Sequence, residues 1–134
     1  MKYLGLDFGT KRTGVAVSDN DGRMAVVKET IEVEGQQAVI DRIKEIIEED
    51  TIESIVVGMP VGLDGQETAQ TEAVKRFIEK LRNHVTIPVQ TIDERLTTEM
   101  AKTLLHGVKN EDRDKVAAQI LLQNFLDQLA EAHE

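Results

Sequence analysis

The chain has 134 residues, enough for one domain with its own hydrophobic core, and we predict a single domain over residues 1–134. It contains no cysteine, which excludes disulfides and thiolate metal sites. It also has no long apolar run and no basic leader segment, so we expect a soluble, cytoplasmic protein that does not enter a membrane. The formal net charge of −9 argues against a uniformly basic, nucleic-acid-binding surface.

The negative charge is unevenly distributed. Between Glu29 and Glu53 there are nine acids and two bases, a net of −7. Several of the basic residues elsewhere lie beside the loops considered below: Lys11, Arg12, Arg95, Lys109, Arg113 and Lys115. The chain can therefore carry one acidic face and one locally basic face.

The first thirty residues predict three antiparallel strands. Apolar runs over 3–8 and 14–18 flank the turn sequence GTKRTG, and a third run covers 24–30. The sequence Asp-Asn-Asp-Gly at 19–22 is typical of the turn between the second and third strands. We therefore expect a meander at the beginning of the chain.

From residue 37 onward the period of the pattern changes. Amphipathic helices are predicted over 37–49 and 68–82, each followed by a short apolar strand, at 55–58 and 89–92. The apolar stripe of the second helix is predicted to begin at Ala69. Thr97 or Thr98 can cap a third helix that reaches Leu105, and a last helix is predicted over 112–130. This order predicts an α/β fold: a mixed five-stranded sheet, with an antiparallel meander and parallel crossovers, flanked by helices.

Asp7 is an acid near the end of an otherwise apolar strand. Burying a carboxylate costs free energy unless a partner or a metal compensates it. The following turn adds the hydroxyl of Thr10 and the charges of Lys11 and Arg12, which suits a metal-bound phosphate. The alternative is that Asp7 is a turn residue whose carboxylate accepts backbone N–H bonds.

Further acids are predicted near Asp7. Ligands of open α/β sheets gather at the carboxyl ends of parallel strands, where Asp93 and Glu94 also lie. Asp114 shares a helical face with Ala117 and Leu121, so it points inward from the first turn of the last helix. The alternatives are that Asp93 is a turn residue and that Asp114 stabilises the helix dipole.

Inward carboxylates from distant parts of the chain form an oxygen-only site. Such a site suits Mg²⁺ or Mn²⁺. Without a cation, like-charge repulsion would raise the pKa of some of these carboxyl groups. Two such ions about 4 Å apart can activate water and stabilise the leaving oxygen in phosphodiester hydrolysis.

Four segments together resemble one known family. The segments GLDFGTKRTGVAVSD, VVGMPVGLDG, IDERLTT and DKVAAQILLQNFLD are similar, in order and spacing, to the signatures of the YqgF family, also called RuvX. This family comprises pre-16S rRNA nucleases and Holliday junction resolvase-like proteins of the ribonuclease H superfamily. The resemblance covers nearly the whole chain and implies a ribonuclease H-like fold.

The resemblance also implies residue roles. It makes Asp7, Glu94 and Asp114 the catalytic, metal-binding acids, with Asp93 as a close substitute for Glu94. Two departures concern binding of the substrate: the family usually has a longer and more basic stretch before its last acid, and it tends to have Asn where this chain has Gly62.

The expected function is a metal-dependent nuclease that uses Mg²⁺ or Mn²⁺ and processes the 5′ end of precursor 16S rRNA in ribosome biogenesis. Thr10, Lys11, Arg12 and Arg95 are expected to bind the phosphates of this structured nucleic acid. One alternative is a Holliday junction resolvase-like DNA endonuclease, which would need a symmetric dimer. Another is a nucleic-acid- or phosphate-binding module that does not cut. We expect a monomer or a weak dimer.

Overall fold

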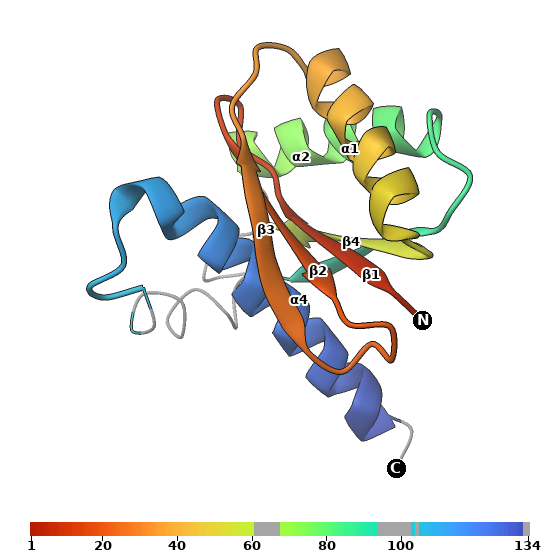
Figure 1. Ribbon diagram of the computed structural model, residues 1–134. Helices are drawn as coiled ribbons and strands as arrows, with labels where there is room; N and C mark the ends of the chain where they lie inside the picture. Colours follow the sequence, from red (N-terminus) through yellow and green to blue (C-terminus); the bar gives the residue numbers. More distant parts are fainter. Residues whose placement is uncertain (61–67, 94–102, 104, 133–134) are drawn as a thin grey trace.

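Five strands form a mixed sheet in the order β3-β2-β1-β4-β5 (Figure 1). The computed structural model describes residues 1–60, 68–93, 103 and 105–132. The strands are β1 (Tyr3–Asp7), β2 (Thr13–Ser18), β3 (Ala25–Ile31), β4 (Ser54–Met59) and β5 (Val89–Asp93). The helices within the described residues are α1 (Gln36–Asp50), α2 (Ala69–Arg82), the short 3₁₀ helix η1 (Asn110–Asp112) and α4 (Arg113–Ala132). The predicted fold class and the predicted strand order of the meander are confirmed.

The antiparallel half of the sheet is the predicted meander. β1 pairs antiparallel with β2, and β2 pairs antiparallel with β3. The turn between β2 and β3 is held by Asp19, whose carboxylate accepts the N–H of Arg23 at 2.8 Å and that of Met24 at 3.4 Å. The hydrogen bond from Arg23 is the main reason that the pKa of Asp19 is lowered. The Asp-Asn-Asp-Gly motif thus forms the turn that the sequence predicts.

The other half of the sheet is parallel. β4 pairs parallel with both β1 and β5, and α1 and α2 provide the crossovers. The carboxyl ends of β1, β4 and β5 therefore meet at one edge of the sheet.

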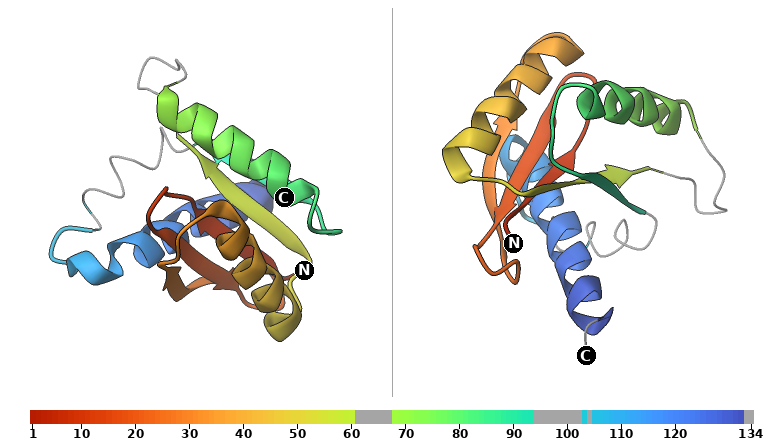
Figure 2. Two further views of the ribbon diagram at one scale, coloured as in Figure 1. Left: turned by 90° about the horizontal axis from the view of Figure 1, so that it is seen from above. Right: turned by 90° about the vertical axis from the view of Figure 1, so that its right-hand side faces the viewer.

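Helices cover both faces of the sheet (Figure 2). α1 and α2 pack on one face, in a core with Leu4, Leu6 and Phe8, while α4 packs on the other face around Tyr3 and Ala16. This division follows from the period of two along each strand, because neighbouring residues point to opposite faces. The face on which a strand residue lies can therefore be determined from its position.

The buried residues of α1 and α2 agree closely with the predicted apolar faces of these helices. In α1 the buried residues include Val39, Ile43 and Ile46. In α2, Thr71 is buried, whereas Ala69, which the sequence predicted on the apolar stripe, is exposed. Thr71 forms a reciprocal capping box with the N-cap Thr68, and its hydroxyl also donates to the carbonyl oxygen of Pro60. A capping threonine therefore takes the buried position and joins α2 to the chain after β4.

Part of the prediction lies outside the described residues. The helix predicted from Thr97 or Thr98 to Leu105 falls almost entirely there, as does Gly62. None of the helices in the described ranges is both long and apolar enough to cross a lipid bilayer.

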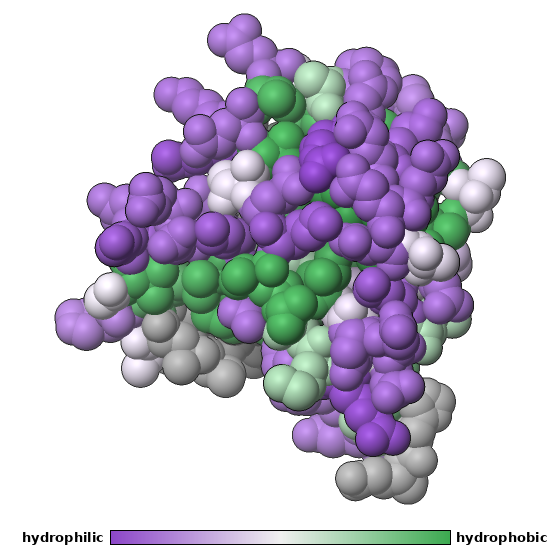
Figure 3. Space-filling model, viewed as in Figure 1, coloured by the Kyte–Doolittle hydropathy of each residue, from purple (hydrophilic) through white to green (hydrophobic). Residues whose placement is uncertain are grey.

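The edge strand β3 exposes apolar side chains, and helix α4 protects its backbone at the first residue. Met24, just before the strand, and Val26 and Val27 in it are exposed, and apolar side chains form a band across this face of the molecule (Figure 3). Two glutamines of α4 bind the backbone of Ala25: its N–H donates to Gln123 at 2.8 Å, and its carbonyl accepts from Gln119 at 3.0 Å. At this residue the two side chains take the place of a neighbouring strand, which protects the beginning of the edge against pairing with another chain.

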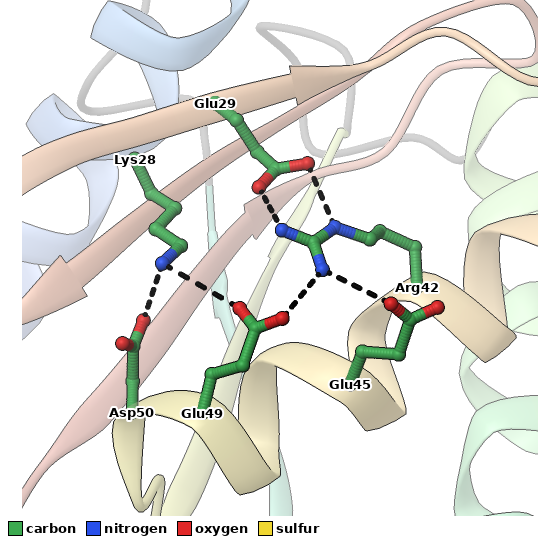
Figure 4. Close-up of polar contacts among 6 residues, drawn as sticks. All are labelled: Lys28, Glu29, Arg42, Glu45, Glu49 and Asp50. Atoms are coloured by element: carbon green, nitrogen blue, oxygen red, sulfur yellow. Dashed lines mark hydrogen bonds and ion pairs between the residues drawn. The ribbon is translucent and has the colours of Figure 1, made fainter.

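An ion-pair network fastens α1 to β3 (Figure 4). The Arg42 guanidinium binds both oxygens of Glu29, at 2.6 and 3.0 Å, and also contacts Glu45 at 3.3 Å and Glu49 at 3.0 Å. The hydrogen bonds to Glu29, and then those to Glu49, raise the pKa of Arg42. Lys28 extends the network through Asp50, at 2.9 Å. The acidic segment found in the sequence is therefore partly neutralised at this contact.

We expect Arg42→Met to lower the free energy of unfolding by about 2 kcal/mol at low salt, because three carboxylates lose their shared cation. The loss should shrink at high ionic strength, where the remaining acids repel one another less. Urea titrations at two salt concentrations measure this, with Lys44→Met, an exposed lysine of the same helix, as the matched control. Equal losses in the two variants would contradict a specific role for the network.

Candidate functional site

Two of the predicted acids end parallel strands. Asp7 is the last residue of β1, and Asp93 is the last residue of β5. Leu6 pairs with Val57 of β4, and Val57 pairs with Thr91 of β5, so the two strands end at nearly the same level. The prediction that Asp7 and Asp93 lie at the carboxyl edge of the sheet is confirmed.

The two acids nevertheless lie on opposite faces. Asp7 alternates with Leu6 and shares its face with Tyr3 and Gly5, which is the face covered by α4. Asp93 pairs directly with Met59, whose side chain packs against the core beneath α1 and α2. Asp93 therefore points away from the face on which Asp7 lies.

Asp114 reaches the Asp7 face because one glycine lets its helix approach. Gly14 pairs with Asp7 across the β1–β2 ladder. A Cβ atom on Gly14 would lie only 1.8 Å from the carbonyl oxygen of Asp114 and 2.9 Å from the backbone nitrogen of Lys115. The first turn of α4 therefore rests directly on the backbone of β2, beside the end of β1. The backbone of Asp114 thus lies against the residue that pairs with Asp7, although the two acids are far apart in sequence.

The start of α4 is shaped by its local sequence. The 3₁₀ helix η1 leads into Arg113, and Asp112 at its end forms an ion pair with Lys115 at 3.1 Å. Asp114 lies in the first turn of α4, and 31% of its side chain is exposed. The predicted inward face is confirmed, since Ala118 and Leu121 are buried. A carboxylate here is stabilised by the helix dipole and still accessible from solvent.

A cation already lies beside Asp114. The Nε atom of Arg12 is 3.3 Å from Oδ2 of Asp114. Arg12 belongs to the β1–β2 turn, which is closed tightly at Gly9, where a Cβ atom would lie 2.5 Å from the carbonyl oxygen of Arg12. The glycine pattern GTKRTG thus determines how this turn presents its charges.

The predicted phosphate ligands within the described residues lie in an open groove. Thr10, Lys11 and Arg12 are exposed and line this groove of about 570 Å³ together with Val33 and two acids, Glu32 and Glu34. The sequence interpretation associated this turn with positive charge and did not include the two glutamates. They follow β3, which ends beside the turn because Ile31 pairs with Thr13. The groove therefore has mixed charge.

Carboxylate oxygens are the donors that suit a hard divalent cation. Asp7 and Asp114 provide carboxylate oxygens on one face, and the guanidinium of Arg12 shows that positive charge is accommodated there. Within the described ranges, no group of three or more histidines, cysteines, aspartates or glutamates is placed to hold a metal ion. Glu94 and Arg95 lie outside the described residues. The residues present fit Mg²⁺ or Mn²⁺ as two oxygen ligands of a larger set.

Comparison with known proteins identifies relatives along almost the entire chain. Residues 1–128 match the family model described as "RuvX: Holliday junction resolvase". The chain is 38% identical over 133 residues to a "Putative pre-16S rRNA nuclease" of Nitratidesulfovibrio vulgaris, covering 95% of this chain and 94% of the relative. It is 41% identical over 134 residues to a protein of the same name from Orientia tsutsugamushi, covering 96% and 85%.

The fold is also found in solved resolvase structures. Thermus thermophilus RuvC in complex with a Holliday junction substrate superimposes with a TM-score of 0.62 at 14% identity, over 97% of this chain and 96% of that one. The fowlpox virus resolvase with Holliday junction DNA superimposes with a TM-score of 0.60 at 9% identity, over 96% and 99%. At these identities the likeness establishes the fold, and it confirms the predicted ribonuclease H-like architecture.

Proposed function

The chain belongs to the RuvX family, and from this premise we propose that it is a metal-dependent phosphodiester hydrolase that processes the 5′ end of precursor 16S rRNA. The observation that supports the proposal is the contact of Gly14, the partner of Asp7 in the β1–β2 ladder, with the backbone of Asp114. The names of relatives at 38% and 41% identity support the choice of RNA.

Each acid in this proposal has a defined role. Asp7, Asp114 and Glu94 would hold Mg²⁺ or Mn²⁺, and the chemistry supplied by the bound metal would be activation of water and stabilisation of charge on the leaving oxygen. We assign the third position to Glu94 rather than Asp93, because Asp93 points to the opposite face from Asp7.

The β1–β2 turn positions the substrate in this proposal. Thr10 and Lys11 contact phosphates from the exposed turn, together with Arg12 and with Arg95. Glu32 and Glu34 line the same groove and repel a polyanion, so they restrict the direction in which a bound strand leaves the site.

We expect Lys11→Ala to weaken binding of a precursor 16S rRNA segment and to reduce the slope of log affinity against log salt by about 1, because one phosphate contact is lost. Turnover at saturating substrate should change little. Filter binding at several salt concentrations measures the slope, with Lys44→Ala on α1 as control. A defect confined to turnover would contradict this role.

The second candidate is resolution of DNA junctions. It is favoured by the description of the family model and by the fold shared with RuvC. Symmetric cleavage of a junction needs two active sites, so it would require a dimer in solution. The apolar and partly unprotected surface of β3, with Val26 and Val27 exposed, is one place where two copies could meet.

The two candidates are separated by offering both substrates to the same protein. A 5′ segment of precursor 16S rRNA and a synthetic four-way DNA junction are incubated with Mg²⁺ or Mn²⁺, and in parallel with EDTA. Metal-dependent cutting of the RNA is the expected result. Cutting of the junction alone would assign the protein to recombination, and no cutting of either substrate by folded protein would favour a role in binding.

A further inference from the structure

The contact between Arg12 and Asp114 joins a predicted phosphate ligand to a predicted metal ligand. Arg12 Nε approaches Asp114 Oδ2 to 3.3 Å, and 56% of the Arg12 side chain and 31% of the Asp114 side chain are exposed. Arg42, by comparison, binds Glu29 through two nitrogens, the closer at 2.6 Å, with 29% of its side chain exposed. The Arg12 contact is therefore the looser of the two and is open to water and ions.

We propose that Arg12 is an exchangeable counter-ion, which binds Asp114 while the metal is absent and moves to a substrate phosphate when the metal binds. This inference rests on the proposed function. It adds a coupling between binding of the metal and binding of the RNA.

The charges of the metal ion and the guanidinium, and the position of Arg12 in the groove, favour this exchange. A divalent ion bound to Asp114 carries twice the charge of a guanidinium, and it would repel a guanidinium 3.3 Å from the same carboxylate. Once released, Arg12 stays within the groove that it lines with Thr10 and Lys11, where its planar group suits bidentate binding of a phosphate. Each binding event therefore makes the other more favourable.

Two thermodynamic consequences follow. The metal must displace Arg12, so the arginine weakens binding of the metal to the free protein. Conversely, without metal Arg12 is held by Asp114 and contributes little to RNA affinity. Because coupling between two ligands is reciprocal, bound metal must strengthen RNA binding through Arg12.

The first test measures Mn²⁺ binding to the protein alone by titration calorimetry. We expect Arg12→Gln to bind Mn²⁺ up to about fivefold more tightly than the wild type, the range of an exposed ion pair. The control is Arg76→Gln, which removes the same charge from an exposed position on α2, across the sheet from α4. Equal affinities in all three proteins, or an equal gain in both variants, would overturn the exchange. A wild type that binds no Mn²⁺ would instead refute the metal-dependent function itself.

The second test measures RNA affinity in EDTA, where no metal takes part. Asp114→Asn should strengthen binding of the precursor 16S rRNA segment, because Arg12 is released. This gain should be lost in the double variant Arg12→Gln/Asp114→Asn relative to Arg12→Gln alone. The same gain in both backgrounds would show that only the removed negative charge matters, and it would overturn the exchange while leaving the nuclease proposal intact.

Discussion

Asp7→Asn should reduce metal-dependent cleavage of precursor 16S rRNA by at least about 10²-fold, the loss expected when a charge-stabilising group is removed from a catalytic site. The amide keeps the shape of the side chain but removes the negative charge that holds the cation. Asp7 ends β1 and is only partly buried, so the sheet should tolerate the change.

The matched control for Asp7 is Asp21→Asn, an exposed acid in the β2–β3 turn. Both variants should unfold within about 1 kcal/mol of the wild type, as usual for substitutions outside the core. Only Asp7→Asn should lose cleavage. Unchanged activity in that variant would remove Asp7 from the mechanism, and unfolded protein would assign it a structural role.

Gly14→Ala should affect both stability and activity. Its Cβ atom would lie 1.8 Å from the carbonyl oxygen of Asp114, and backbone atoms cannot rotate away as a side chain can. Either β2 or the start of α4 must move, at a cost of about 3 kcal/mol in the free energy of unfolding. A shift of Asp114 by about 1 Å should also lower cleavage by about 10²-fold.

The control for Gly14 is Gly35→Ala, before α1. Gly35 has φ of 87°, and a Cβ atom there would meet nothing within 4 Å. Its cost should be that of its backbone conformation alone, φ 87° and ψ 145°, about 1–3 kcal/mol, with cleavage retained. Urea denaturation and cleavage rates are measured on both variants. If Gly14→Ala were as stable and active as the wild type, the close contact with α4 would not be needed to place Asp114.

The sequence predicted what depends on local pattern. The apolar run of β1 and the helical stripes of α1 and α4 set which side chains are buried, and both signals extend over neighbouring residues. The inward face of α4, and with it the position of Asp114 on that face, could be derived in this way. The prediction that Ala69 lies on the apolar stripe was wrong, because Thr71 takes the buried position in the first turn of α2. The hydroxyl of Thr71 is satisfied by its capping contacts.

Other features depend on contacts between distant segments. In the sequence Gly14 cannot be distinguished from an ordinary turn glycine. Its role depends on its contact with α4, which follows one hundred residues later. The sequence left Asp93 and Glu94 as alternatives, because the face of a strand residue depends on the register with Met59 in β4. Likewise, Glu32 and Glu34 were counted with the acidic segment, although the pairing of β3 with β2 places them beside Arg12.

The short stretch before Asp114 bears on substrate binding. It includes two bases, Lys109 and Arg113. The base that follows Asp114 is already engaged, since Lys115 pairs with Asp112 at 3.1 Å. Together with the mixed groove at the β1–β2 turn, this leaves fewer cations for phosphates than a basic loop would supply. Affinity for RNA should therefore depend strongly on the few remaining contacts, which makes Lys11 and Arg12 the informative positions.

The central claim is that Asp7 and Asp114 act together on one metal-dependent centre. The most direct measurement removes metal from the protein with a chelator and follows cleavage of the precursor 16S rRNA segment as Mg²⁺ or Mn²⁺ is added back, for wild type, Asp7→Asn and Asp114→Asn. We expect cleavage to return in the wild type and to stay at least about 10²-fold lower in both variants. Cleavage that persists in chelator, or that returns equally in the variants, would contradict the account.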